Sequence, residues 1–268
     1  MKDGILGVIP ARLGSTRLPR KPLHPIAGRP LIEWVWRRAA AADLFERLVI
    51  ATDSPEIVRV AEGFGAEAVL TDPAHPSGTD RVAEVARRPE NQRFRVIVNV
   101  QGDEPFVRTD QLVPPIELVR EEGWDIGTAA TLLRSVEEWR DPAAVKVVRG
   151  ADGAALYFSR APIPYLRDAE PDAADLASGA FLRHLGIYVY AADALARWVS
   201  LPEGELERIE RLEQLRPLAA GVRIGVAIVP PVEGGVDTPE DARAAERRLR
   251  QELDLNDGLS EPRDELAR

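Results

Sequence analysis

Short apolar runs alternate with longer segments of helical periodicity along the first half of the chain, and this alternation constrains the fold more than any other feature. Four apolar runs predict strands: Ile5 to Ile9, Leu48 to Thr52, Ala68 to Leu70 and Val96 to Val100. Residues 30–42 have the apolar spacing of a helix, and Asp53-Ser54-Pro55 is typical of the start of a second helix. The alternation predicts an α/β chain with a largely parallel sheet covered by helices.

The second half of the chain predicts a less regular sheet. Strands are expected at 126–133, 186–190 and 222–229, and a hairpin is expected at 145–148 and 154–158. The sheet is therefore expected to be mixed, mostly parallel, with the hairpin as an inserted subregion. Residues 162–178 are rich in Pro, Asp and Ala without a regular period, which predicts an irregular loop and a candidate lid. A last helix is expected to open at Pro239, capped by Asp237 or Thr238.

Length and composition predict one globular domain. The chain has 268 residues, of which 45% are hydrophobic, and shows neither a repeat nor a linker-like change of composition. We expect a single domain over residues 1–255 and a flexible tail over 256–268.

The chain has no cysteine, which excludes a disulfide framework, a thiolate zinc site and a catalytic thiol, and agrees with a reducing compartment. The first apolar run is far shorter than a membrane span, so neither export nor membrane insertion is expected.

The charge distribution predicts where an anion binds. The net charge is −9, which argues against nucleic acid or anionic lipid as a partner, because those partners need a basic face. Residues 1–38 depart from this balance, with eight basic residues against two acidic ones. A small anionic ligand near this segment would explain the excess, although a solvated basic surface would produce it too.

The loop that follows the first strand has the chemistry of a polyphosphate site. It joins a buried strand to a helix, the position at which open α/β sheets bind ligands. Gly14 and Ser15 allow close approach of backbone N–H donors, Arg12 and Arg17 offer guanidinium donors, and Lys21 offers a compact positive charge. The spacing matches neither the P-loop nor the dinucleotide-binding pattern. A phosphate loop of another type is therefore the favoured interpretation.

Two carboxylates are expected at the same edge of the sheet. Asp103 lies just past the strand at 96–100, and Asp237 follows the last strand. Two carboxylates from separate strand ends can share one Mg²⁺ ion and leave its other positions to water and phosphate oxygens. Taken singly, Asp103 fits a turn and Asp237 fits a helix cap. The basic loop at the same edge favours the metal site.

An ordered set of motifs spans roughly residues 5–245. They are PAR (10–12), STRLP (15–19), KPL (21–23), ATD (51–53), HPSGTDR (75–81), NVQGDEP (99–105), AAVKVV (143–148), ALYFSR (155–160), RHLGIY (183–188), LEQLR (212–216) and GVDTPED (235–241). This ordered set resembles the family of 3-deoxy-manno-octulosonate cytidylyltransferases, the CMP-Kdo synthetases. HPSGTDR, YFSR and RHLGIY are the most specific of these motifs.

The resemblance implies a Rossmann-like nucleotidyltransferase fold and the reaction of CTP with 3-deoxy-D-manno-octulosonate (Kdo) to give CMP-Kdo and diphosphate. Residues 1–125 would mainly bind CTP, and residues 126–235 would mainly bind the sugar and form dimer contacts. The implied CTP-binding positions are Pro10, Ala11, Arg12, Ser15, Lys21, Thr52, Asp53, Ser77, Gly78, Arg81 and Gln101. The implied catalytic residues are Arg12 and Lys21, together with Asp103 and Asp237 as the magnesium ligands.

The resemblance also implies an acceptor site and a mechanism. The implied sugar-binding positions are Gln101, Arg160, His184, Tyr188 and Glu213, with Arg160 facing the sugar carboxylate. The C2 hydroxyl of the sugar would attack the α-phosphorus in line, assisted by Mg²⁺ and by charge neutralisation. A cytoplasmic homodimer acting in lipopolysaccharide biosynthesis would follow, with small-molecule substrates and neither nucleic acid nor membrane as a partner.

Other interpretations stay open from the sequence. His184 fits a hydrogen bond at the core edge, Tyr188 fits strand packing, and Glu213 fits an exposed helix position. The acceptor could be an amino-substituted Kdo, because a single altered contact can change that choice. Another acid sugar such as sialic acid is a further alternative, but the sialic-acid enzymes resemble this sequence at the first loop and not at RHLGIY. A nucleotide-binding regulator without turnover is disfavoured by Lys21 occurring together with both carboxylates. A purely structural interaction protein would need an exposed apolar surface, which sequence does not show.

Overall fold

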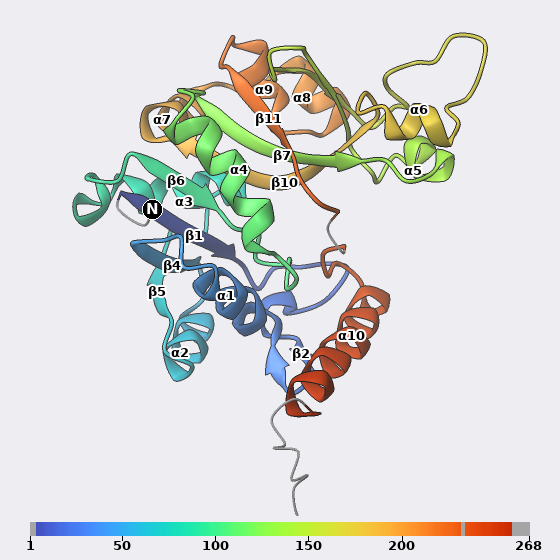
Figure 1. Ribbon diagram of the computed structural model, residues 1–268. Helices are drawn as coiled ribbons and strands as arrows, with labels where there is room; N and C mark the ends of the chain where they lie inside the picture. The colour runs from blue at the N-terminus through green and yellow to red at the C-terminus, as the bar shows by residue number, and fades with distance from the viewer. Residues whose placement is uncertain (1–3, 232–233, 259–268) are drawn as a thin grey trace, which may run out of the picture.

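The computed structural model describes residues 4–231 and 234–258, and places a nine-stranded sheet at their centre. The strand order along the main path is β11-β7-β10-β6-β1-β4-β5 (Figure 1). Strand β8 joins this path by pairing with β10 and β9. Pairs β6–β1, β1–β4, β4–β5 and β7–β11 are parallel, whereas β10 is antiparallel to both of its main neighbours. The prediction of a mixed sheet with an inserted hairpin is confirmed.

The parallel half follows the predicted alternation. Its strands are β1 (Ile5–Ala11), β4 (Arg47–Thr52), β5 (Glu67–Leu70) and β6 (Val96–Asn99). Its helices are α1 (Leu31–Ala41), α2 (Pro55–Gly63) and α3 (Gly78–Arg87). Ser54 and Ser77 start α2 and α3, because each side chain accepts a hydrogen bond from the backbone of the first helical turn. Short pieces join these elements: η1 (Lys21–Leu23), β2 (Pro25–Ile26), β3 (Arg29–Pro30) and η2 (Pro89–Asn91).

The antiparallel half is built around β10 (Leu182–Ala191), which lies between β6 and β7 (Ile126–Leu132). The register of β10 against β7 shifts between Leu185 and Tyr188. The hairpin consists of β8 (Lys146–Arg149) and β9 (Ala155–Ser159), and β11 (Ile224–Ile228) closes the sheet beside β7. The remaining helices are α4 (Thr109–Arg120), α5 (Val136–Arg140), α6 (Ala173–Ala177), α7 (Ala192–Ser200), α8 (Glu205–Glu210), α9 (Leu215–Ala219) and α10 (Pro239–Gly258).

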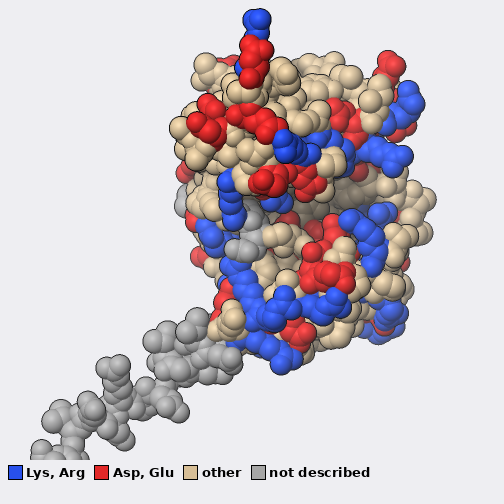
Figure 2. Space-filling view, turned by 90° about the vertical axis from the view of Figure 1, so that its right-hand side faces the viewer, with Lys and Arg blue, Asp and Glu red and all other residues tan. Residues whose placement is uncertain are grey.

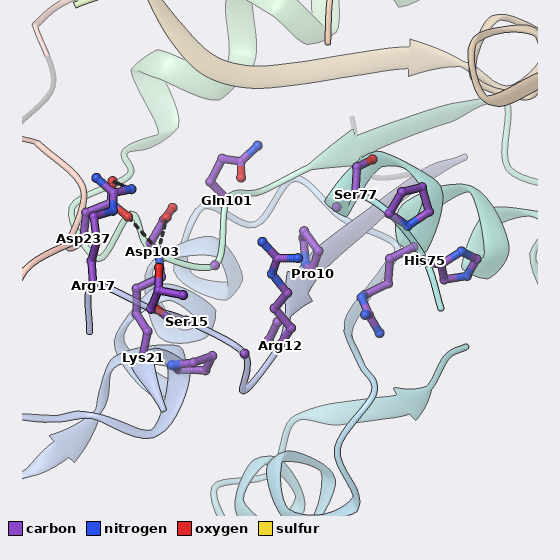
Figure 3. A pocket seen from close by; sticks show the side chains of 18 of the residues that line it. Pro10, Arg12, Ser15, Arg17, Lys21, His75, Ser77, Gln101, Asp103 and Asp237 are labelled. Carbon is purple, nitrogen blue, oxygen red and sulfur yellow. Dashed lines mark hydrogen bonds and ion pairs between the residues drawn. The ribbon is translucent and has the colours of Figure 1, made fainter. Parts of the chain in front are cut away.

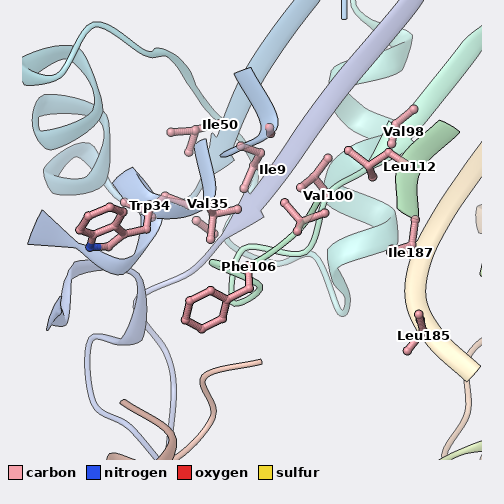
Figure 4. Packing of buried hydrophobic residues seen from close by; sticks show 14 of the residues in the cluster. Ile9, Trp34, Val35, Ile50, Val98, Val100, Phe106, Leu112, Leu185 and Ile187 are labelled. Atoms are coloured by element: carbon pink, nitrogen blue, oxygen red, sulfur yellow. The ribbon is translucent and has the colours of Figure 1, made fainter. Parts of the chain in front are cut away.

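Two hydrophobic clusters hold the sheet between helical layers. Alternate side chains of β6 point to opposite faces, so Val98 joins one cluster and Ile97 joins the other. The first cluster includes Leu112 of α4 and Trp34 and Val35 of α1 (Figure 4). It also includes residues of α2 and α10. The second includes Trp198 of α7 and residues of α3 and α9. Strand β6 is thus covered on both faces, as its apolar sequence predicts.

Two expectations about irregular segments are corrected. Residues 162–178 contain α6, which begins where Asp172 accepts hydrogen bonds from the Ala174 and Asp175 backbones and which buries Leu176 against Phe181. A single helical turn is too short to leave a periodic signal, so the sequence did not predict it. Helix α10 continues to Gly258, so the expected tail at 256–268 begins in helix, and its last ten residues lie outside the described part. Within 4–231 and 234–258, no helix is long and apolar enough to cross a membrane.

Candidate active site

A cavity of about 370 Å³ opens where β1 and β6 end at the same edge of the sheet (Figure 3). Its wall comes from five stretches that are distant in sequence: the loop after β1, residues 75–81, residues 101–103, Glu213, and Asp237 just before α10. The space-filling view shows this side of the molecule hollowed, with basic and acidic side chains around the hollow (Figure 2). The topology thus brings the predicted phosphate loop and both predicted carboxylates into one site.

The loop after β1 presents its basic side chains to the cavity while one apolar residue anchors it. Leu18 is buried in the core, whereas Arg12 and Arg17 are exposed and line the cavity. Ser15 N–H donates to the Leu13 carbonyl at 2.9 Å, which folds the loop tightly beside Gly14. The loop therefore offers the guanidinium groups of Arg12 and Arg17 to an anion, whereas the Ser15 N–H, predicted as a donor to the anion, is already bonded within the loop.

Lys21 lies between the two predicted metal ligands. Its Nζ atom is 2.6 Å from Asp103 Oδ2 and 3.0 Å from Asp237 Oδ1, and Arg17 Nη2 is 3.0 Å from Asp237 Oδ2 (Figure 3). Burial alone would lower the pKa of Lys21, but the two carboxylates outweigh it and raise that pKa. A cation thus already occupies the space between Asp103 and Asp237, and hard oxygen donors around a cation fit Mg²⁺.

The start of α10 explains why Asp237 is available for that contact. Thr238 Oγ1 accepts from Asp241 N–H at 3.2 Å, and Asp241 Oδ2 accepts from Thr238 N–H at 2.8 Å. This reciprocal pair caps the helix, so Thr238 is the cap. The carboxylate of Asp237 remains directed at Lys21 and Arg17, which removes the alternative in which Asp237 serves only as a cap.

Residues 75–81 form the wall opposite the carboxylates. His75, Ser77, Gly78 and Arg81 all line the cavity. Arg81 is only 3% exposed, and its guanidinium lies 3.3 Å from Asp53 Oδ2. Asp53 does not line the cavity and lies behind Arg81, which does.

Thr52 also lies outside the cavity lining. Its Oγ1 accepts from Ser54 N–H at 3.1 Å, at the start of α2. Contact of Thr52 or Asp53 with a nucleotide therefore stays a prediction.

A second cavity of about 260 Å³ adjoins the first and shares Gly78, Gln101 and Glu213 with it. Tyr188 lines this second cavity. Gln101 Nε2 donates to the Gly186 carbonyl at 3.0 Å, which fixes the side chain between the two cavities. Burial raises the pKa of Glu213, whose Oε2 accepts from Thr79 Oγ1 at 3.4 Å. Three of the five predicted sugar positions are thus together.

His184 lies beside this group rather than on either cavity wall. Its Nε2 is 2.9 Å from Thr128 Oγ1, and its ring contacts the Phe158 and Tyr188 rings at centroid distances of 4.9 and 5.4 Å. Burial lowers the pKa of His184 to about 3, so the imidazole is neutral at physiological pH. Its contact with Tyr188 gives it an indirect link to the second cavity.

Arg160 follows β9 and is not in the lining of either cavity. Its guanidinium donates to three backbone carbonyls, those of Glu210 at 2.9 Å, Pro142 at 3.0 Å and Arg211 at 3.4 Å. It therefore binds the turn that leads to the second cavity, where Arg211 itself is a lining residue. Its direct contact with a sugar stays a prediction.

The comparisons with known proteins agree over almost the whole chain. Residues 6–224 match the cytidylyltransferase family profile. The chain is 52% identical over 237 residues to the 3-deoxy-manno-octulosonate cytidylyltransferase of Gemmatimonas aurantiaca, a match that covers 88% of this chain and 91% of that protein. The chain belongs to the 3-deoxy-manno-octulosonate cytidylyltransferase family. The Syntrophobacter fumaroxidans protein of that name is 45% identical over 249 residues, covering 92% of this chain and 98% of the relative.

Solved structures place this family member on a known fold. A CMP:2-keto-3-deoxy-manno-octonic acid synthetase complexed with CTP matches it with a TM-score of 0.85 and 38% identity, covering 93% of this chain and 99% of that one. A 4-diphosphocytidyl-2C-methyl-D-erythritol synthase from Anaerococcus prevotii matches with a TM-score of 0.58 at 13% identity, over 92% of this chain and 98% of the other. The second match shows a common nucleotidyltransferase fold alone. The Rossmann-like fold implied by the sequence motifs is confirmed.

Sequence reasoning missed two buried ionisable residues of this cytidylyltransferase. Glu104, next to Asp103, has an Oε2 atom that is buried without a hydrogen-bond partner. Burial, with the charge of Asp103 next in importance, raises the pKa of Glu104 to about 8. Lys146 is fully buried, and its Nζ donates to the carbonyls of Asp141 and Arg160, both at 2.8 Å. Both residues lie within the quoted motifs, but no periodic signal marks them as buried.

Proposed function

We propose that the protein transfers CMP from CTP to the C2 hydroxyl of Kdo, releasing diphosphate. The observation that carries this proposal is the contact of Lys21 with both Asp103 and Asp237 inside the cavity that the basic loop lines. A second cavity joined to the first at Gln101 and Glu213 provides room for an acceptor beside the nucleotide. Membership of the cytidylyltransferase family supports the choice of nucleotide and acceptor.

The basic loop binds and orients the triphosphate in this proposal. Arg12 and Lys21 present side-chain donors to the phosphates from one side of the cavity, and Ser15 lines the cavity beside them. Buried Arg81, held by Asp53, presents its guanidinium from the opposite wall. Phosphoryl transfer depends mainly on positioning and on charge neutralisation, so these groups supply much of the catalysis. A covalent enzyme intermediate is not required.

Asp103 and Asp237 would hold a Mg²⁺ ion. Bound there, Mg²⁺ would neutralise phosphate charge and lower the pKa of a nearby hydroxyl. Within 4–231 and 234–258, no group of three or more His, Asp or Glu side chains is placed to hold a metal, so the two carboxylates leave most coordination positions to water and substrate. Lys21 must then leave the carboxylates, and the triphosphate is the anion to which it moves.

The second cavity would bind the acid sugar. Gln101 and Tyr188 offer neutral hydrogen-bonding groups, and Glu213 faces both cavities. Arg160 is proposed to bind the sugar carboxylate, as the family resemblance implies, and it also holds the turn that carries Arg211. His184, which is neutral, is proposed to contribute to sugar binding through its ring contact with Tyr188.

The wider setting follows from the substrates. CTP is a cytoplasmic nucleotide, so we place the protein in the cytoplasm and in lipopolysaccharide biosynthesis. Residues 1–255 are proposed to act as one domain, with 1–125 mainly binding CTP and 126–235 mainly binding the sugar. A homodimer formed through the hairpin and the following helices completes the proposal.

Phosphorus NMR tests the reaction. With CTP, Kdo and Mg²⁺, a phosphodiester signal and a diphosphate signal should grow in equal amounts while CTP declines. Neither signal should grow when Kdo is omitted. Parallel reactions contain sialic acid or amino-substituted Kdo in place of Kdo. A phosphodiester that forms only with one of these acceptors would retain the nucleotide site and overturn the assigned sugar.

A further inference from the structure

The segment that carries Asp237 is joined to the segment that carries Asp103 by a backbone hydrogen bond. Val236 N–H donates to the Asp103 carbonyl at 2.8 Å, and the Val236 side chain is 1% exposed within the core. The residue before Val236 is Gly235. Both predicted metal ligands therefore depend on the same junction between the β6 loop and the start of α10.

Gly235 fits this junction because it has no side chain. A Cβ atom on Gly235 would lie 3.0 Å from Glu104 Oε1 and 3.3 Å from the Asp103 carbonyl oxygen. Both distances are shorter than ordinary van der Waals contacts to a methyl group, and one of the neighbours is backbone. The other neighbour, Glu104, has its second carboxyl oxygen buried without a hydrogen-bond partner. The adjacent Gly234 has nothing within 4 Å of its corresponding position.

We propose that Gly235 and Glu104 are positioning residues for the cation site: the Glu104 carboxyl supports the chain at Gly235, and this contact sets the spacing of the Asp237 and Asp103 carboxylates. This inference rests on the proposed function, in which those two carboxylates hold the metal. Glu104 and Gly235 do not contact the reacting atoms in this account. They act through Asp237, whose carboxylate must meet the one on Asp103 across the space that Lys21 now occupies.

The test is direct binding of Mn²⁺, measured by electron paramagnetic resonance on the full chain in the presence of CTP. Gly235→Ala should weaken Mn²⁺ binding about tenfold, the scale on which residues that orient metal ligands act. Gly234→Ala is the matched control and should bind Mn²⁺ as the native chain does. In a Glu104→Ala background, Gly235→Ala should cause a smaller loss, because the closest contact has been removed. Thermal unfolding of each variant without metal checks that the fold is intact.

The outcomes separate this inference from the proposed function. Asp237→Asn serves as the reference for a lost ligand. If Asp237→Asn leaves Mn²⁺ binding unchanged, the metal assignment itself fails. If Asp237→Asn weakens binding while Gly235→Ala and Gly234→Ala behave alike, the metal site stands and the positioning role is overturned. An equal loss for Gly235→Ala with and without Glu104 would overturn the part assigned to Glu104.

Discussion

Replacing Lys21 by Met should tighten the binding of a divalent metal to the protein without nucleotide. The Lys21 ammonium contacts Asp103 at 2.6 Å and Asp237 at 3.0 Å, so an incoming cation must first displace it. A hydrogen bond to a charged group contributes about 1.5–3 kcal/mol, and the 42% exposure of the Asp237 side chain reduces its share by solvent screening. Removing the Lys21 ammonium, with its contact to Asp103 and its screened contact to Asp237, therefore predicts about 2 kcal/mol of easier metal binding, which is on the order of tenfold to thirtyfold in affinity.

The same substitution should weaken the binding of CTP. Without Lys21 the basic loop loses its most buried positive charge, and CTP affinity in the absence of metal should fall about tenfold. The two opposite effects distinguish a counter-ion that moves to the phosphates from a lysine that only stabilises the loop.

Titration calorimetry with Mn²⁺ and with CTP measures both effects. Arg20→Met is the matched control, because Arg20 lies on the same loop and its guanidinium pairs with Glu56 at 2.5 Å instead of with the two carboxylates. That variant should leave Mn²⁺ affinity unchanged. The reasoning is refuted if Lys21→Met changes Mn²⁺ affinity no more than Arg20→Met does, or weakens it.

Four further substitutions test other parts of the account. Asp103→Asn and Asp237→Asn should each remove most turnover while CTP still binds, measured by diphosphate release and calorimetry; full activity in either variant would exclude that residue from the metal site. Arg160→Ala should raise the KM for the acid sugar more than the KM for CTP, and the reverse ratio in steady-state kinetics would contradict its role. Burial would raise the pKa of Glu84, but hydrogen bonds from Arg88, His75 and the backbone outweigh it and lower that pKa to about 2. The Glu84 carboxylate therefore stabilises the fold above pH 4.5, the ordinary pKa of a glutamate, and loses that effect as the pH falls toward 2. Glu84→Gln should lower the free energy of unfolding, measured with urea, by about 2 kcal/mol at pH 7 and by progressively less in acid. An unchanged difference between pH 7 and pH 3 would show that the carboxylate charge is not the cause.

The parallel half of the fold was predictable because buried parallel strands are nearly continuous apolar runs. Val96 to Asn99 is covered on both faces and is recognisable from sequence. Helix α4 was not predicted, since it contains Pro114 and Pro115, and proline within a helical segment normally argues against a helix. The ten-residue length of β10 was underestimated for a different reason: its first residues pair with β8, and that pairing depends on the hairpin being placed first.

The candidate site was predictable in its residues and not in its contacts. Asp103 and the basic loop were predictable because each follows the end of a parallel strand, and parallel strands bring their carboxyl ends to one edge of the sheet. The contact between Lys21 and Asp237 joins residues that lie far apart in the chain, so it appears only once β11 is placed beside β7. The direction of Arg160 toward backbone carbonyls depends on side-chain packing that sequence patterns do not encode.

The most direct test of the central claim is diphosphate release with Mg²⁺ for each of the four nucleoside triphosphates, paired in turn with Kdo, amino-substituted Kdo and sialic acid. The account predicts release with CTP and Kdo together and background release for every other pair. Release with CTP and another acid sugar would contradict the acceptor assignment, and background release in every pair would contradict the enzyme itself and favour a nucleotide-binding regulator.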